Sequence, residues 1–68
     1  MAMLKVIEVL AESDQSWEDA AQVAVRNASE TLRGIRSIYV KEMEATVGED
    51  GRITHYRINA KISFTIER

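Results

Sequence analysis

The 68-residue sequence has no cysteine, no proline and a single histidine, and its aromatic residues are one tryptophan, two tyrosines and one phenylalanine. Without cysteine no disulfide forms, and His55 alone cannot build a Cys/His zinc site. A chain of this length buries only about 60% of its unfolded surface when it folds. Because disulfides and zinc are excluded, self-association is the remaining way to supplement the stability of such a small core.

The sequence also lacks long runs of one charge and long apolar runs. Nine basic and eleven acidic residues give a net charge of −2, and no block of five or six like charges would attract a nucleic acid. The longest uncharged stretch, residues 20–25, is too short to span a bilayer, and Lys5 and Glu8 interrupt any signal-peptide core. These features predict a soluble cytoplasmic protein without nucleic-acid or membrane partners.

The C-terminal segment carries the clearest pattern. From Tyr56 to Ile66 every even position is apolar, whereas the odd positions from His55 to Thr65 are polar. Strict alternation is typical of a strand with one buried and one exposed face. Residues 52–66 would extend roughly 50 Å at about 3.3 Å per residue. A chain of 68 residues is too small to cover the apolar face of such a strand by itself. Other copies of the chain are therefore expected to bury part of it.

Three further elements precede this strand. Residues 3–10 predict a first strand and residues 11–15 a polar break. Ser16 is a suitable helix N-cap, with Asp19 in the capping-box position, and Gly34 is placed to end a helix of about seventeen residues. The apolar stripe of this helix comprises Trp17, Ala20, Ala21, Ala24, Ala28, Thr31 and Leu32.

Residues 35–47 predict a second strand, and residues 48–51 supply the turn of a hairpin into the long strand. Simple alternation places Ile38 and Val40 on one face of the second strand, and Ser37, Tyr39, Lys41 and Met43 on the other.

The order of elements is β-α-β-β, which indicates an α+β class. A helical crossover makes the first two strands parallel, and the hairpin makes the third antiparallel to both. The longest strand satisfies both neighbours from the centre, so we predict a three-stranded antiparallel sheet of order 1-3-2 packed on one helix. Residues 1–68 form one domain in this interpretation.

Several segments together resemble the dodecins. They are Val6-Ile7-Glu8-Val9, Ser16-Trp17-Glu18-Asp19-Ala20, Leu32-Arg33-Gly34-Ile35-Arg36, His55-Tyr56 and Lys61-Ile62-Ser63-Phe64. The resemblance implies a hollow homododecamer of cubic 23 symmetry that stores a flavin (FMN, FAD or riboflavin) and is not a catalyst. It also implies a stacking Trp after the Ile-Arg pair and a Gln after the His-Tyr pair.

This sequence has Ser37 in place of that Trp and Arg57 in place of that Gln. Serine offers no ring for stacking, and arginine presents hydrogen-bond donors only. We therefore expect weak binding of flavin or a related aromatic cofactor, with Ser37, Tyr39, Glu42 and Arg57 as the ligand-binding residues. Tyr39 is either a substitute aromatic wall or an interface residue. Glu42 falls on the face of Ile38 and Val40 unless a bulge intervenes, so a ligand contact and a solvated strand end both stay open.

An alternative is a dodecin-like shell without flavin that binds calcium or another cation. The resemblance implies this because some family members that lack the Trp bind cations, notably calcium, and this sequence is more similar to that branch. Glu44, Glu49 and Asp50 near the hairpin tip are the candidate ligands, because a symmetric shell can gather carboxylates from several chains. No EF-hand pattern is present, and a purely structural shell is a third interpretation.

Catalysis is not expected. The sequence shows no nucleophile–base pair, no metal-ligand cluster and no glycine loop for phosphate. Trp17 at the start of the helical stripe favours packing over ligand binding. His55 on the polar face is open to a pH or metal role but has no partner ligands in the sequence.

Overall fold

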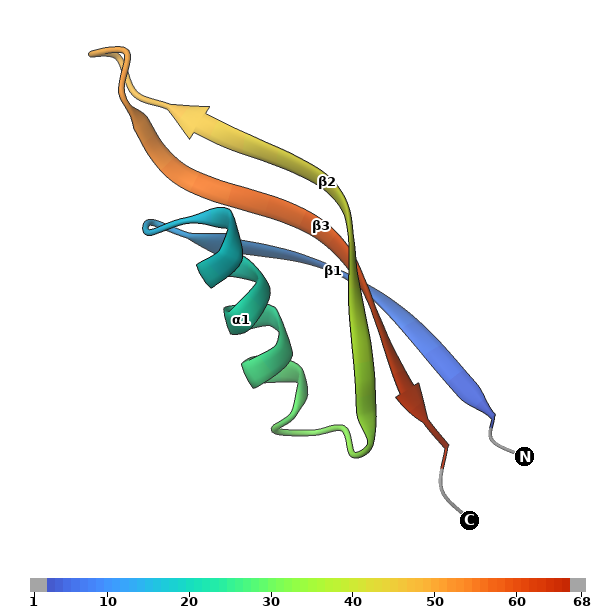
Figure 1. The fold of residues 1–68 in the computed structure, drawn as a ribbon. Coiled ribbons are helices and arrows are strands. Elements are labelled where there is room, and N and C mark those ends of the chain that lie inside the picture. Colours follow the sequence, from blue (N-terminus) through green and yellow to red (C-terminus); the bar gives the residue numbers. More distant parts are fainter. Residues whose placement is uncertain (1–2, 67–68) are drawn as a thin grey trace.

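The computed structural model describes residues 3–66, which form β1 (Leu4–Ser13), α1 (Trp17–Ala28), β2 (Ile35–Val47) and β3 (Ile53–Thr65). The strands make one sheet of order β1-β3-β2, and β3 is antiparallel to both neighbours. Helix α1 lies against one face of this sheet (Figure 1). The predicted α+β topology is therefore confirmed.

The core forms where the alanine stripe of α1 meets the centre of β3. Ala20 and Ala24 are buried on the helix, and Ile58, Ala60 and Ile62 are 1%, 0% and 0% exposed on the strand. Small side chains on the helix allow its backbone to approach the sheet closely, and each buried isoleucine stabilises the fold by roughly 1.5–3 kcal/mol. The predicted alternation of β3 is confirmed here.

The helix is much shorter than the sheet that it covers. The molecule measures 52 × 20 × 13 Å, whereas the 12 residues of α1 span about 18 Å. In Figure 1 the β2–β3 hairpin extends past the helix at one end of the sheet, and the start of β1 lies at the other. Large apolar side chains are exposed along the sheet. Leu4, Val6 and Leu10 lie on the face turned away from α1, and Met43, Val47 and Ile53 lie towards the β2–β3 hairpin.

Strand β1 continues through the segment predicted to be a polar break. Glu12 pairs with Arg57 and Ser13 with Tyr56, so the ladder extends to residue 13. The polar side chains of this extension find partners on other elements: Glu12 binds Arg57 on β3, and Ser13 binds Asp19 on α1. The prediction that β1 ends at residue 10 is therefore wrong.

The start of α1 is as predicted, with one difference in the cap. The Ser16 hydroxyl accepts a hydrogen bond from the Asp19 backbone N–H at 2.9 Å, which satisfies one of the free donors at the helix start. The Asp19 carboxylate does not complete a capping box. Its Oδ2 accepts from the Ser13 hydroxyl at 2.6 Å and so ties α1 to the end of β1.

The end of α1 comes earlier than predicted. The helix stops at Ala28, and backbone bonds from Glu30 to Asn27 and from Thr31 to Ala28, both 3.2 Å, form tighter turns beyond it. Gly34 does not terminate the helix directly. It has φ +72° at the entry to β2, and its carbonyl accepts from the Thr65 backbone N–H at 3.0 Å. Docking of this segment on β3 therefore redirects the chain before a longer helix can form.

Strand β2 has the predicted bounds, but its register against β3 shifts between Ile35 and Ser37, between Val40 and Glu42, and between Thr46 and Val47. The first two shifts insert Arg36 and Lys41 into β2 and reverse the alternation of the β2 side chains that follow, whereas the third inserts Thr54 into β3. Met43 consequently pairs with Ile58 on the helix side of the sheet. The predicted placement of Met43 beside Tyr39 is therefore wrong.

No helix within residues 3–66 has the length and apolar character needed to cross a membrane.

Candidate ligand-binding face

The face of the sheet turned away from α1 carries all four predicted ligand-binding residues. We call it the open face and define it by the cross-strand pairs on it. From β1 it takes Glu8, Leu10 and Glu12, from β3 Arg57, Asn59, Lys61 and Ser63, and from β2 Ser37, Tyr39, Glu42 and Glu44.

Glu42 reaches the open face because of the bulge that precedes it. Val40 pairs with Ala60 and Glu42 with Asn59, so Lys41 is the extra residue on β2. Without this insertion Glu42 would point to the side of α1 together with Val40. The bulge that the sequence left open is therefore present, and it brings Glu42 to the same face as Ser37, Tyr39 and Arg57.

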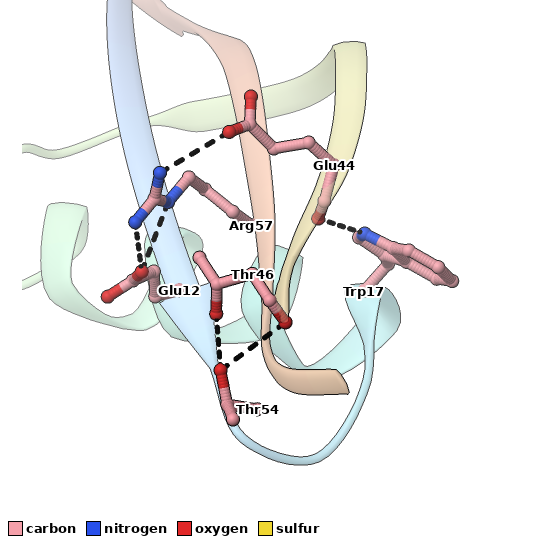
Figure 2. Close-up of polar contacts among 6 residues, drawn as sticks. All are labelled: Glu12, Trp17, Glu44, Thr46, Thr54 and Arg57. Carbon is pink, nitrogen blue, oxygen red and sulfur yellow. Dashed lines mark hydrogen bonds and ion pairs between the residues drawn. The ribbon is translucent and has the colours of Figure 1, made fainter. Parts of the chain in front are cut away.

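Arg57 lies at the centre of a charged cluster that crosses the sheet (Figure 2). Its Nε and Nη2 donate to Glu12 Oε1 at 3.0 and 2.7 Å, and its Nη1 donates to Glu44 Oε2 at 3.3 Å. One guanidinium on the central strand thus binds a carboxylate on each edge strand. The cluster carries a formal charge of −1, and Arg57 has most of its donors occupied.

The electrostatics of this cluster follow its hydrogen bonds. The hydrogen bond from Arg57 lowers the pKa of the Glu12 carboxyl below its usual range, and the positive charges of Arg57 and His55 add to this effect against a partial desolvation. The same hydrogen bond to Glu12 raises the pKa of Arg57. Both groups therefore stay charged throughout the neutral range.

Ser37 and Tyr39 differ in how available they are for a ligand. The Ser37 hydroxyl is bonded to the Ser63 hydroxyl on β3 at 2.6 Å, so it already has a partner within the sheet. Tyr39 is 65% exposed and presents a free aromatic ring on the open face. Of the two, Tyr39 is the side chain that offers contact area to an incoming group.

Asn59 is an open-face residue that the sequence did not single out. Its Oδ1 is buried without a hydrogen-bond partner within residues 3–66. Such an atom is costly to leave unpaired. It lies at the centre of the face, between Leu10 on β1 and Glu42 on β2.

The predicted cation ligands do not form a site within one protomer. Glu44 is bonded to Arg57 on the open face, whereas Glu49 and Asp50 lie in the hairpin turn, where Asp50 Oδ1 accepts from the Arg52 backbone N–H at 3.0 Å. Within residues 3–66 no three His, Cys, Asp or Glu side chains come close enough to hold a metal ion. A cation site from these residues would need carboxylates of several chains, and it stays a prediction.

Trp17 packs as predicted and adds a polar contact that fixes β2. Its ring meets Tyr56 edge to face at 4.9 Å between centroids and 78° between planes. Its Nε1 donates to the Glu44 carbonyl at 2.8 Å, which Figure 2 also shows. His55 lies on the open face, where it pairs with Thr46 of β2, and its side chain is exposed.

Comparison with known proteins gives the chain its family. The sequence model described as Dodecin matches residues 3–67. The chain belongs to the dodecin family. This confirms the resemblance that the sequence segments indicated.

Two curated relatives differ in what their names state. The calcium dodecin of Mycobacterium tuberculosis is 41% identical over 94% of this chain and 89% of its own length. The dodecin of Thermus thermophilus is 33% identical over 93% of this chain and 90% of its own.

Solved dodecins share the fold over nearly the whole chain. An arginine-to-alanine mutant of the Thermus thermophilus dodecin aligns with a TM-score of 0.92 at 31% identity, covering 100% of both chains. The Mycobacterium tuberculosis calcium dodecin, described as calcium chelating with a novel calcium-binding site, aligns with a TM-score of 0.82 at 37% identity over 96% of this chain and 91% of that one.

Glu12 is a further site residue that the sequence did not single out. It fell in the supposed polar break, although the even positions Leu4, Val6, Glu8 and Leu10 lead to it in regular alternation. Extending that pattern by one step would have placed Glu12 on a strand, but nothing local identifies Arg57 as its partner.

Proposed function

We propose that this chain is a single dodecin-like domain that assembles into a homododecameric shell and binds and stores a small ligand. The observation that carries the proposal is the 52 Å sheet covered only in part by one short helix, in a protein of the dodecin family. An unpaired apolar surface of this extent favours burial between copies of the chain.

The assembly is tested by native mass spectrometry of the purified protein. The expected result is a dominant species of twelve chains across a wide range of protein concentration. A folded monomer as the main species would overturn the proposed shell. The proposal does not include catalysis, and a cytoplasmic location stays a prediction.

Our first candidate ligand is a flavin or a related aromatic compound, bound weakly on the open face. Tyr39, Glu42 and Arg57 support this candidate because they share that face with Ser37. Two features argue for low affinity: Ser37 contributes no ring, and Arg57 is already bonded to Glu12 and Glu44. A planar ligand loses about 0.5–1.5 kcal/mol for each aromatic stack that is missing.

Riboflavin fluorescence tests this candidate. We expect quenching with a midpoint above about 10 μM. This corresponds to a binding free energy of at most roughly 7 kcal/mol in magnitude. Purified protein without colour, with no quenching at millimolar protein, would remove flavin from consideration.

The second candidate is calcium or another divalent cation. It is favoured by the identity of 41% to a relative named calcium dodecin and by the carboxylates of the open face and the hairpin, whose oxygens are suitable calcium ligands. A melting temperature that rises with calcium and returns after EDTA supports this candidate, because a ligand that binds only the folded state stabilises it. Magnesium at the same ionic strength is the control. An equal response to both ions would indicate general screening of charge.

A further inference from the structure

An apolar groove with a positively charged rim lies at one end of the protomer. It has a volume of about 460 Å³, and Leu32, Phe64 and Ile66 provide its apolar surface beside Lys5 and Arg33. Among residues 3–66, no carboxylate lines this groove and neither cation forms an ion pair. Its charge and shape suit an acidic segment with apolar flanks.

The β2–β3 hairpin is such a segment, and it lies at the opposite end of the sheet (Figure 1). Its turn carries the exposed residues Glu49 and Asp50, which outnumber the single cation Arg52. Val47 and Ile53 flank the turn and are 64% and 49% exposed. The Glu49 carboxylate has no hydrogen bond or ion pair in the described part of the chain, whereas Asp50 is occupied in shaping the turn.

We infer that the hairpin of one copy docks in the groove of a second copy, with Glu49 facing Lys5 and Arg33 and with Val47 and Ile53 against Leu32, Phe64 and Ile66. This inference rests on the proposed assembly and names a contact within it. Opposite charges select the partner and its orientation, while the apolar contacts bury surface that is otherwise exposed.

The contact joins two different surfaces, because hairpin and groove lie at opposite ends of a 52 Å molecule. A head-to-tail contact of this kind closes into a ring when the rotation between copies permits it. The hairpin turn also suits insertion. Gly51 has φ +85° and nothing within 4 Å of the position of a Cβ, so the tip is open at this residue.

Charge reversal tests the inference directly. We expect Glu49→Lys to raise the protein concentration at which the assembly dissociates by about tenfold or more, since like charges would then meet at the contact. Adding Lys5→Glu and Arg33→Glu to the same chain should restore assembly to within about threefold of the parent. Asp14→Lys makes the same charge change outside both surfaces and should leave assembly unchanged. Circular dichroism of each variant checks that its secondary structure is unchanged.

The absence of cysteine offers an independent test. A chain with Glu49→Cys and Arg33→Cys should form disulfides between copies under mild oxidation, visible as ladders on non-reducing gels, whereas Asp14→Cys with Arg33→Cys should not. A disulfide requires Cα atoms within about 7 Å of each other.

The outcomes separate this contact from the shell itself. If the parent assembles but Glu49→Lys has no effect and no specific disulfide forms, the inferred contact is wrong and the proposed shell stands. If the parent is monomeric, both are wrong.

Discussion

The indole of Trp17 and the backbone of Glu44 are joined across the edge of the sheet. Trp17 Nε1 donates to the Glu44 carbonyl oxygen at 2.8 Å, while the Glu44 side chain accepts from Arg57 on the other side. Trp17, the first residue of α1, therefore holds β2 at Glu44, whose carboxylate belongs to the charged cluster of the open face.

Replacing Trp17 with phenylalanine keeps an apolar ring against Tyr56 and removes the hydrogen bond to Glu44. We expect a loss of about 0.5–1.5 kcal/mol in the free energy of unfolding, and a larger loss of roughly 2–4 kcal/mol for Trp17→Ala, which also leaves a cavity. Urea unfolding at one fixed protein concentration measures both, because assembly contributes to stability. Equal losses for the two variants would mean that the ring packing contributes little.

The pair of Glu12 and Arg57 predicts a dependence of stability on pH. Folding lowers the pKa of Glu12 through its hydrogen bond from Arg57, so the pair stabilises the protein above the unfolded-state pKa of about 4.3. That stabilisation is lost as pH falls through the lowered pKa. The melting temperature of the parent should therefore exceed that of Glu12→Gln at neutral pH, and the two should converge once the pH falls below the lowered pKa of Glu12.

Added salt should shrink the same difference, since both side chains are partly exposed. Glu30→Gln is the matched control, because Glu30 forms no ion pair within residues 3–66. A gap between parent and Glu12→Gln that stays constant from neutral to acidic pH would contradict the ion pair as its cause.

The fold was predictable where local patterns determine it and not where distant contacts do. Strand β3 was clear because its alternation is local, and the bounds of β2 followed from the glycines on either side. The end of β1 was missed because Glu12 depends on a partner 45 residues away. The end of α1 was missed because the docking of Gly34 on Thr65 sets the path of the chain after Ala28.

The candidate site was predictable in its residue types more than in its state. The position of Arg57 on the polar face follows from alternation, but its two carboxylate partners lie on separate strands. The face of Glu42 depends on a bulge, and no residue type in the sequence marks that bulge uniquely.

Flavin affinity should respond to two substitutions on the open face. Ser37→Trp supplies a stacking ring, and Arg57→Gln supplies both a donor and an acceptor. We expect the double variant to bind riboflavin about tenfold or more tightly than the parent, measured by fluorescence titration. Ser37→Leu with Arg57→Gln adds apolar area without a stacking indole and should give less gain.

Arg57→Gln alone belongs in this series because it leaves Glu12 and Glu44 without their shared cation, and its melting temperature separates instability from poor binding. No gain for a stably folded double variant would mean that the site differs from flavin-binding dodecins at more than these two positions.

Gly34 and Gly51 allow a matched test of how the loop after α1 is held. Both have positive φ, +72° and +85°. Alanine at either position would have to adopt this unfavourable backbone conformation, at a cost of roughly 1 kcal/mol in the free energy of unfolding. A Cβ at Gly34 would in addition collide with the Thr65 hydroxyl, whereas a Cβ at Gly51 meets nothing. Gly34→Ala should therefore lower the free energy of unfolding by at least about 1 kcal/mol more than Gly51→Ala.

Combining Gly34→Ala with Thr65→Ala removes the colliding hydroxyl together with its hydrogen bond to the Gly34 carbonyl at 3.1 Å. A double-mutant cycle in urea should show coupling between the two positions, because the collision exists only when both the methyl group and the hydroxyl are present. Independent, additive losses would place the cost of Gly34→Ala in backbone conformation alone.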